Sequence, residues 1–445
     1  MSSTRVALPS RLSAGAVLRA PRTLFYGWWI VAIASVMHCF HGGLYGTGMT
    51  VYFLPVARDL GVTRAALSLA FTLRSMESGL DGPLIGYLVD RMGPRAMIRA
   101  GALLGGLGFV LLALTQDYLS FLAVFLGVLA LGMSSGVGHS SMALLNNWFA
   151  RRRATAITLG HIGTEVGGAL LTPLVGLMVL NAGWRPTAIL SGALLPLVLV
   201  PLSFFIRNTP EAMGLGPDGD PPARRPGVDG RPGATAAFHG QQKGEFGVKE
   251  AMRTRAFWQL ALAMGFRQFA KTGLHVHLVP LMVWKGVDEP GAALLVGLLA
   301  FCQVPSRIGG AWLGDRWSMT RTPAFSCLIG VAALGVLVFG PAGPLWTSLA
   351  FVLLFALAES GNLVSWALVG HFFGRNRFAT LRGAISTVST PLTLVAPVFL
   401  GWVFDQSDSY FWALLPMLGS YLVASLLYAS LRPPGPRDVA TGRPS

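Results

Sequence analysis

Long apolar segments alternate with short polar segments along most of the chain. The hydrocarbon core of a bilayer is about 30 Å thick, so about 20 apolar residues are needed for a helix to cross it. Segments of this length recur along the sequence, and we predict an all-α membrane protein with twelve transmembrane helices. The predicted helices cover residues 26–55, 65–90, 96–115, 118–147, 154–181, 184–206, 255–284, 291–314, 322–341, 344–372, 379–404 and 409–431.

A polar segment, residues 207–254, separates the first six predicted helices from the last six. It is rich in proline and glycine and carries scattered charges of both signs, a composition that cannot bury a core. We therefore expect a mobile cytoplasmic linker between two six-helix bundles. The predicted organisation is an N-terminal tail at 1–24, a bundle at 25–206, the linker, a second bundle at 255–431 and a C-terminal tail at 432–445.

Two short motifs repeat between these halves. The first surrounds Asp90 and has a degraded copy around Asp315, 225 positions later. The second, residues 147–153, is answered by residues 372–377 at an offset of 224. Two matches at nearly one offset indicate an internal duplication, which predicts two pseudo-symmetric halves related by an axis along the membrane normal.

Composition and charge support a membrane protein and indicate its orientation. The chain is 53% hydrophobic and 12% charged, whereas soluble domains are about 25% charged. Lys and Arg outnumber Asp and Glu by 34 to 19, and the arginines gather in the loops that follow the even-numbered predicted helices. Cytoplasmic loops collect such residues, so we expect both termini in the cytoplasm and the protein in the cell (inner) membrane. No basic face on a soluble fold is predicted, and we expect no nucleic-acid partner.

The sequence offers no pattern typical of an enzyme or a metal site. Its three cysteines fall inside apolar segments without disulfide or metal-ligand spacing. Nucleotide-binding loops, zinc-protease helices and nucleophile elbows are also missing from the sequence. We therefore expect no catalysis, no cofactor and no metal.

Residues 86–95 match the loop signature G-x-x-x-D-R-x-G-x-R at every defined position. In this motif, and in its number of predicted helices, the chain resembles the major facilitator superfamily of secondary transporters. Two further segments, Tyr26-Gly27-Trp28-Trp29 and residues 148–156, are similar to signatures of monocarboxylate porters and bacterial oxalate/formate antiporters. The resemblance implies a substrate site between two bundles that expose it alternately to the two sides of the membrane.

The narrower resemblance also implies a role for Arg307. In that family an arginine of the eighth helix binds the substrate carboxylate, and Arg307 stands at the matching position. Animal monocarboxylate porters have an acidic residue four positions earlier and a lysine late in the first helix, where this chain has Gln303 and Thr47. Their proton-coupling arrangement therefore cannot be transferred intact.

Ionisable residues at bilayer depth are costly, and they usually face the interior of a helix bundle. Arg267, Lys271 and His275 recur every four residues, so they share one helix face and would form a wall that attracts anions. The alternative is that Arg267 pairs with a carboxylate such as Glu359 and that His275 lies near the outer membrane surface. A guanidinium suits bidentate binding of a carboxylate, although Arg307 could also form a structural ion pair with a facing helix. The residues predicted to bind substrate are Arg307, Arg267, Lys271, Gln303, Tyr45 and Asn362.

Proton coupling requires a group that titrates within the membrane. A buried carboxyl such as Glu165 can bind and release a proton near neutral pH, and histidine titrates there without perturbation. The alternatives are a neutral structural hydrogen bond for Glu165 and His41, and an ion pair of Glu77 with Arg74 on one helix face. The proton-coupling candidates are Glu165, His41, His38, Glu77, Glu359 and His275.

The motif around Asp90 is predicted to gate the cytoplasmic side. Gly86 permits close approach of two helices, and Asp90 can accept hydrogen bonds at the amino end of a helix, where the dipole favours negative charge. By the resemblance, that helix is the eleventh, and Asp315 would contact the fifth helix in the same way. We expect the second contact to be weaker because Ala311 replaces the glycine there. The predicted gating residues are Gly86, Asp90, Arg91, Arg95, Asp315 and Arg316.

Together these features predict a secondary transporter of a small organic anion, with a monocarboxylate such as lactate carried in symport with a proton. The expected partners are this anion, the proton and membrane lipid, and we expect a monomer. Three alternatives remain open: a carboxylate/carboxylate antiporter of the oxalate-formate type, a drug/proton exporter that uses Glu77, Asp81 and Glu165, and a membrane receptor that transports nothing.

Overall fold

The computed structural model describes residues 25–63, 81–221 and 246–434, together with positions 66, 67, 69–71, 73, 74 and 76. These residues form helices and turns and no strand, so the prediction of an all-α fold is confirmed. Among them, ten helices are long and apolar enough to cross a membrane. Glu77, both predicted tails except residues 432–434, and linker residues 222–245 lie outside the described part.

The N-terminal helices follow the predicted segments closely. The first path runs through α1 (Tyr26–Phe40), a π-helical stretch (His41–Gly46) and α2 (Met49–Asp59). The others are α4 (Gly82–Met92), α5 (Pro94–Ala113), a path from α6 (Tyr118–Val124) through α7 (Leu131–Met133) to α8 (Ser140–Trp148), α9 (Arg153–Ala182) and α10 (Trp184–Phe204).

The C-terminal helices repeat this order after the short helix α12 (Val248–Arg253). They are α13 (Arg255–Val276) continued by α14 (Leu278–Trp284), α15 (Glu289–Arg316), α16 (Arg321–Phe339), α17 (Leu345–Ala358) with α18 (Asn362–Phe373), α19 (Phe378–Ser407) and α20 (Phe411–Ser430). The 22-residue helix α13 is not among the ten apolar helices, because polar side chains such as Arg267 and Lys271 lower its hydropathy.

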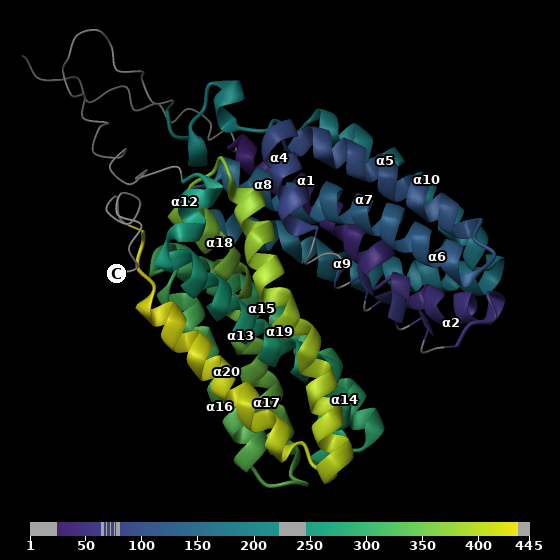
Figure 1. Ribbon diagram of the computed structural model, residues 1–445, viewed down its shortest axis with the longest axis vertical. Coiled ribbons are helices and arrows are strands. Elements are labelled where there is room, and N and C mark those ends of the chain that lie inside the picture. Colours follow the sequence, from purple (N-terminus) through teal and green to yellow (C-terminus); the bar gives the residue numbers. More distant parts are fainter. Residues whose placement is uncertain are drawn as a thin grey trace, which may run out of the picture.

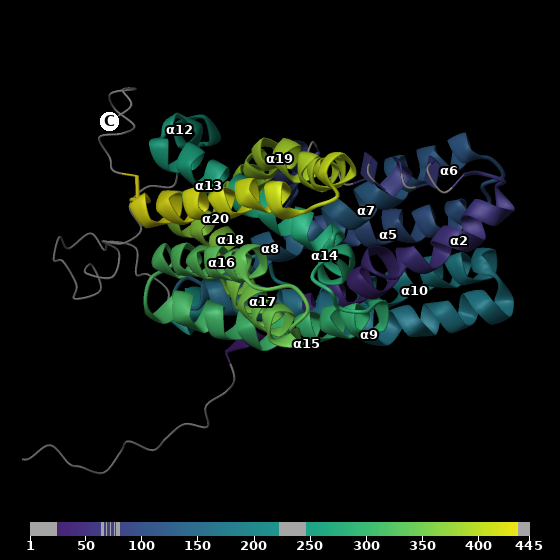
Figure 2. The ribbon, with the colours of Figure 1, turned by 90° about the horizontal axis from the view of Figure 1, so that it is seen from below.

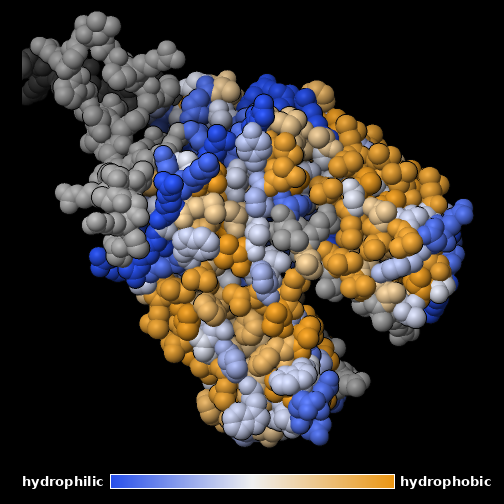
Figure 3. Space-filling view, viewed as in Figure 1, coloured by the Kyte–Doolittle hydropathy of each residue, from blue (hydrophilic) through white to orange (hydrophobic). Residues whose placement is uncertain are grey.

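The two sets of helices form two lobes that meet at one end (Figures 1 and 2). There α4 packs against α19 and α9 packs against α15; we call this the closed end. At the other end, near α2 and α14, the lobes diverge and leave an open notch on the surface (Figure 3); we call this the open end. On the face seen in Figure 3, both lobes are largely hydrophobic along their length, as expected for contact with lipid.

Close backbone packing holds α1 and its π-helical extension against α9. A Cβ atom added at Gly163 would lie 1.8 Å from the carbonyl oxygen of Ser35, and one at Gly42 would lie 2.2 Å from that of Thr164. Only glycine fits at such distances. This packing brings the polar face of α9 beside the histidines of α1.

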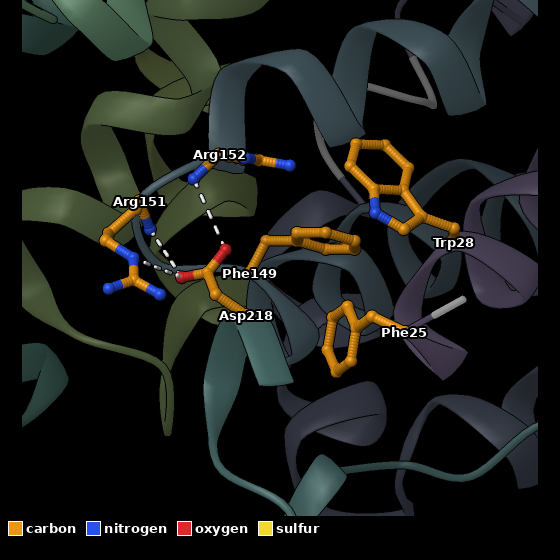
Figure 4. Close-up of a pocket in the computed structure, with 6 residues that line it drawn as sticks. All are labelled: Phe25, Trp28, Phe149, Arg151, Arg152 and Asp218. Atoms are coloured by element: carbon orange, nitrogen blue, oxygen red, sulfur yellow. Dashed lines mark hydrogen bonds and ion pairs between the residues drawn. The ribbon is translucent and has the colours of Figure 1, made fainter. Parts of the chain in front are cut away.

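The described ends of the predicted linker are ordered. Asp218 accepts hydrogen bonds from the backbone nitrogens of Ala150 (3.0 Å) and Arg151 (2.7 Å), in the loop between α8 and α9. Figure 4 shows this carboxylate beside a pocket of about 190 Å³ lined by Phe25, Trp28, Phe149, Arg151, Arg152 and Asp218. These contacts differ from the expectation of a wholly mobile linker, because the exposed backbone donors of the loop are satisfied by a linker side chain.

Candidate functional site

Three cations converge on one buried carboxylate in the C-terminal lobe. Glu359 begins the single 3₁₀ turn (Glu359–Gly361) that separates α17 from α18, and its side chain has no exposed surface. Its Oε2 atom lies 3.0 Å from Lys271 Nζ and 3.9 Å from Arg307 Nη2, while its Oε1 atom lies 3.3 Å from Arg267 Nη2. A buried charge requires partners of opposite sign, and here one carboxylate serves three.

Arg267 is enclosed by this arrangement. Its side chain is 2% exposed and donates to Asn362 Oδ1 at 2.9 Å and to the carbonyl oxygen of Ala358 at 3.0 Å. Ala358 is the last residue of α17, where carbonyl groups lack partners within the helix. The geometry thus favours the alternative interpretation for Arg267, pairing with Glu359. Arg267 and Asn362 stabilise the break between α17 and α18, which places Glu359.

Arg307 and Lys271 reach the space between the lobes. Their side chains are 11% and 19% exposed, in contrast to Arg267. Arg307 Nη1 forms an ion pair with Glu165 Oε1 of α9, in the opposite lobe, and Glu165 is 41% exposed. The second nitrogen, Arg307 Nη2, donates to Gln303 Oε1 at 3.2 Å. The guanidinium is therefore held between two lobes by groups that face the intervening space.

His275 extends this network along α13. Its Nδ1 atom lies 3.1 Å from the carbonyl oxygen of Lys271, and its Nε2 atom lies 3.2 Å from Gln303 Nε2. The imidazole packs 5.1 Å from the ring of Phe355 and is exposed. The spacing that predicted one shared face for Arg267, Lys271 and His275 thus places all three around the same site, although at different depths.

The N-terminal wall of the site is built from aromatic and imidazole rings. His38 is buried and satisfied by Ser141 Oγ (2.8 Å) and Thr164 Oγ1 (3.3 Å), which is the structural role named as the alternative for such histidines. Its ring lies 4.8 Å from that of His161, and 6.2 Å from that of His41. His161 and Glu165 are four residues apart on α9, so this wall continues toward the ion pair with Arg307.

Tyr45 lies deeper in the N-terminal lobe than its predicted role requires. It is 6% exposed, its ring packs 5.4 Å from that of His41, and Arg74 stacks on its other side at 4.5 Å. Arg74 also donates to the carbonyl oxygen of Tyr45 at 3.2 Å. These contacts describe an interior support for the wall, and the pairing of Arg74 with Glu77 falls outside the described residues.

Arg382 of α19 is a neighbour of the site that the predicted set omitted. It stacks over the ring of Trp366 at 5.0 Å, and in the described part of the chain its Nε and Nη1 atoms have no hydrogen-bond partner. The signal was visible as an arginine inside an apolar segment. Its stacking partner could not be identified, because α18 and α19 meet only in the folded lobe.

Two aspartates join the lobes at the closed end. Asp90 of α4 accepts from the backbone nitrogens of Ala379 (3.2 Å) and Thr380 (2.9 Å) and from Thr380 Oγ1 (2.6 Å), at the amino end of α19. We call this the first latch. A Cβ atom added at Gly86 would lie 2.2 Å from the carbonyl oxygen of Ala379, so glycine permits the approach. The structure shows the helix-end contact that the sequence predicted.

Asp315 of α15 forms the second latch. It accepts from the backbone nitrogens of Ala154 (2.9 Å) and Thr155 (2.8 Å), at the amino end of α9. Backbone donors at a helix start carry partial positive charge and favour a carboxylate. The side chain of Thr155 also bonds to Asp315, as that of Thr380 does to Asp90, so the two latches have matching sets of donors.

The arginines of the two motifs make their contacts within one lobe. Arg95 donates through its backbone nitrogen to Asn208 Oδ1 (2.9 Å) and through Nε to the carbonyl oxygen of Ser203 (3.1 Å). Arg91 lies 3.3 Å from Tyr87 Oη, and Arg316 stacks over Trp312 at 4.6 Å. The contacts that cross between lobes at these motifs come from the aspartates, and the gating role of the arginines stays a prediction.

Residues 31–397 match the family model of the Major Facilitator Superfamily. The chain belongs to this superfamily. The resemblance drawn from residues 86–95 is thereby confirmed. A multi-pass membrane transporter is established at this level, and members of the superfamily are not in general enzymes.

Similar proteins include transporters of organic anions. Monocarboxylate transporter 6 of Homo sapiens is 23% identical over 414 residues, which cover 90% of this chain and 79% of that protein. The oxalate:formate antiporter of Oxalobacter formigenes is 23% identical over 332 residues, which cover 74% of this chain and 73% of that protein. Among solved structures, the E. coli fucose:proton symporter superposes with a TM-score of 0.66 at 14% identity, covering 92% of this chain and 99% of its own. This last likeness concerns the fold.

Proposed function

We propose that this superfamily member transports a small monocarboxylate, such as lactate, together with a proton. The observation that carries the proposal is the position of Arg307, a partly exposed guanidinium between the lobes that already holds a carboxylate, Glu165, from the opposite lobe. A substrate carboxylate offers the same two oxygens in the same plane, and arginine binds such groups bidentately. The substrate would replace Glu165 on Arg307.

The charge balance of the site suits a single negative charge. Arg267, Lys271 and Arg307 bring three positive charges, while Glu359 and Glu165 bring two negative charges, which leaves one positive charge. A monocarboxylate neutralises it. Lys271 stands beside Arg307 as a second partly exposed cation, and Glu359 Oε2 lies close to both. Lys271 therefore strengthens the anion-binding wall without leaving its own carboxylate.

Displacement of Glu165 supplies the coupling to a proton. Once the substrate binds Arg307, the carboxylate of Glu165 would lose its cation and would lie close to the carboxylate of the substrate. Two neighbouring carboxylates cannot both stay ionised at low cost, so Glu165 would take up a proton from the open side. Substrate and proton then occupy the site together, and the lobes can rock around a site whose net charge has not changed.

The test is uptake of labelled lactate into proteoliposomes with an inward proton gradient. We expect wild-type protein to accumulate lactate and Arg307→Ala to lose this uptake. Truncating one partner of a buried, hydrogen-bonded charge pair costs about 2–5 kcal/mol, so the loss should be thirtyfold or more, by the rule that about 1.4 kcal/mol is a factor of ten. Arg321→Ala, which removes an exposed arginine at the start of α16, is the matched control and should transport normally.

The same assay separates the alternatives. Exchange of internal for external carboxylate, unaffected by a pH gradient, would support an antiporter, as the similarity to the oxalate:formate antiporter allows. Unchanged lactate uptake by Arg307→Ala would contradict the assignment of the substrate site. Extrusion of a cationic dye without any anion flux would replace the proposal with a drug exporter, and lactate binding without flux would indicate a receptor.

A further inference from the structure

The hydrogen bonds that join Arg307, Gln303 and His275 have only one consistent direction. A guanidinium can only donate, so the Gln303 atom that lies 3.2 Å from Arg307 Nη2 is the carbonyl oxygen, Oε1. The amide nitrogen of Gln303 therefore faces His275 Nε2, at 3.2 Å. An amide nitrogen only donates, so His275 Nε2 accepts.

The other ring nitrogen completes the assignment. His275 Nδ1 lies 3.1 Å from the carbonyl oxygen of Lys271, which can only accept. Nδ1 therefore carries the hydrogen, and the imidazole is neutral in this arrangement. Arg307 thus donates to Gln303 Oε1, Gln303 Nε2 donates to His275 Nε2, and His275 Nδ1 donates to the backbone of α13.

A proton added to His275 Nε2 would reverse part of this chain. An imidazolium donates from both nitrogens, so its Nε2–H group would face the N–H group of Gln303. A half-turn of the Gln303 amide restores the bond, with Oε1 accepting from His275. The amide nitrogen would then face Arg307, where two donors cannot bond, so Arg307 Nη2 would lose its hydrogen bond to Gln303 and keep only the longer contact with Glu359 Oε2.

We propose that His275 is a proton-sensing positioning residue, which controls through Gln303 whether Arg307 is free to bind a carboxylate. The inference rests on the proposed function and assigns to it a step that precedes substrate binding. A hydronium ion in the water at the exposed imidazole transfers one proton to Nε2: one O–H bond breaks, one N–H bond forms and a water molecule remains. The Arg307 nitrogen that has lost Gln303 becomes available to the substrate. Carboxylate binding is then stronger where His275 is protonated.

The charged groups around His275 act in both directions, since two cations oppose its protonation and one carboxylate favours it. The charged groups that face it are Lys271 on its own helix, Glu359 beyond the end of α17, and Arg307 on α15. Phe355 of α17 packs against the ring at 5.1 Å. The imidazole is exposed while Gln303 is buried, so a proton reaches the histidine from water and its effect passes inward through the amide.

The test separates this device from the protonation of Glu165. All variants are made in the Glu165→Gln background, where Glu165 can neither occupy Arg307 as a carboxylate nor titrate. Lactate affinity is measured by thermal stabilisation of the purified full-length protein, between about pH 4.5 and about pH 7.5. This range extends well to the acid side of where free histidine titrates, because Lys271 and Arg307 lie beside His275. We expect affinity to rise about three- to tenfold as the pH falls, because the fraction of protein with a released Arg307 sets the apparent affinity.

Two substitutions should remove this pH dependence with opposite results. His275→Gln cannot take up a proton, yet its carbonyl can still accept from Gln303, so lactate affinity should stay low at every pH. Gln303→Leu cannot hold Arg307, so affinity should stay high at every pH. His277→Gln is the matched control, because His277 bonds to Tyr410 Oη (3.1 Å) and to the carbonyl oxygen of Pro397 (3.0 Å), away from Arg307. It should keep the pH dependence.

Failure of the inference and failure of the proposed function give different results. If His275→Gln retains the pH dependence, or if Gln303→Leu binds weakly at every pH although both proteins melt cooperatively, the role of His275 is overturned. If lactate stabilises neither the wild-type protein nor Glu165→Gln at any pH, while the proteins are folded, the proposed monocarboxylate function fails instead.

Discussion

At the scale of single residues, the carboxylate of Glu359 stands out because it has three cationic partners. It is fully buried and serves Arg267, Lys271 and Arg307. We expect Glu359→Gln to destabilise the protein by about 3–5 kcal/mol, because removing one member of a buried ion pair leaves the others uncompensated. The measurement is the thermal unfolding of purified protein in detergent.

Glu165→Gln is the control for that experiment. Glu165 also pairs with Arg307, but its side chain is 41% exposed, so water can replace the lost contact. Exposed ion pairs contribute only about 0–1 kcal/mol, and the melting temperature should change little. Equal destabilisation by both substitutions would contradict a central role of Glu359 in holding the lobe together.

Residue spacing predicted which side chains share this site. It could not predict which of them are buried in the lobe and which reach the space between the lobes. The four-residue interval placed Arg267, Lys271 and His275 on one face of α13, as the structure shows. Their exposure depends on the 3₁₀ turn at Glu359, which brings an acceptor to Arg267 and encloses it. A break of one turn inside an apolar segment leaves no periodic signal, so the buried role of Arg267 stayed one of two alternatives.

At the scale of elements, the contact of α4 with α19 depends on glycine. Gly86→Ala would place a Cβ atom 2.2 Å from the carbonyl oxygen of Ala379. No side-chain rotation can relieve this clash, because the oxygen belongs to the backbone. We expect the closed end to loosen. A cysteine introduced there should then react faster with a membrane-impermeant thiol reagent, and this labelling is the measurement. The lobe itself should stay folded because the clash lies between lobes.

Gly297→Ala is the matched control, since nothing lies within 4 Å of a Cβ atom built at that position of α15. Both changes replace a helical glycine by alanine and have the same small effect on helix propensity, about 1 kcal/mol in favour of alanine. Labelling at the closed end should therefore rise only with Gly86→Ala. Equal labelling of the two variants would mean that the approach of α4 to α19 does not depend on Gly86.

The helices themselves could be predicted well from the sequence. The boundaries of α13 with α14 and of α9 fall at or within one residue of the predicted segments, because membrane thickness sets helix length and charged loops mark the ends. The order within residues 207–221 was missed. It depends on Asp218, whose partners are backbone nitrogens of a distant loop, and a proline- and glycine-rich composition gives no indication of such contacts.

At the scale of the whole molecule, the repeated motif predicted both latches but not which end of the protein is open. Two arrangements of the same lobes differ by only a few kcal/mol, and the sequence of each lobe is compatible with both. The structure has a closed end where Asp90 and Asp315 bind helix starts, and an open end near α2 and α14 (Figure 1). We therefore expect the latches to set the balance between the two arrangements.

The two latches should contribute unequally to that balance. Each aspartate accepts from two backbone nitrogens and from a threonine side chain, but the first latch has Gly86 where the second has Ala311. Replacing either aspartate by asparagine removes its charge from a helix start, worth about 0.3–1 kcal/mol, and turns an NH₂ group toward a donor. The first latch also holds the closely packed pair α4 and α19, so the population of molecules open at the closed end should rise several-fold more with Asp90→Asn than with Asp315→Asn. Distance distributions between spin labels on α2 and α14 would report this shift as shorter distances across the open end. A larger shift with Asp315→Asn would contradict the expected order, because the latch that carries Ala311 in place of glycine would then be the stronger one.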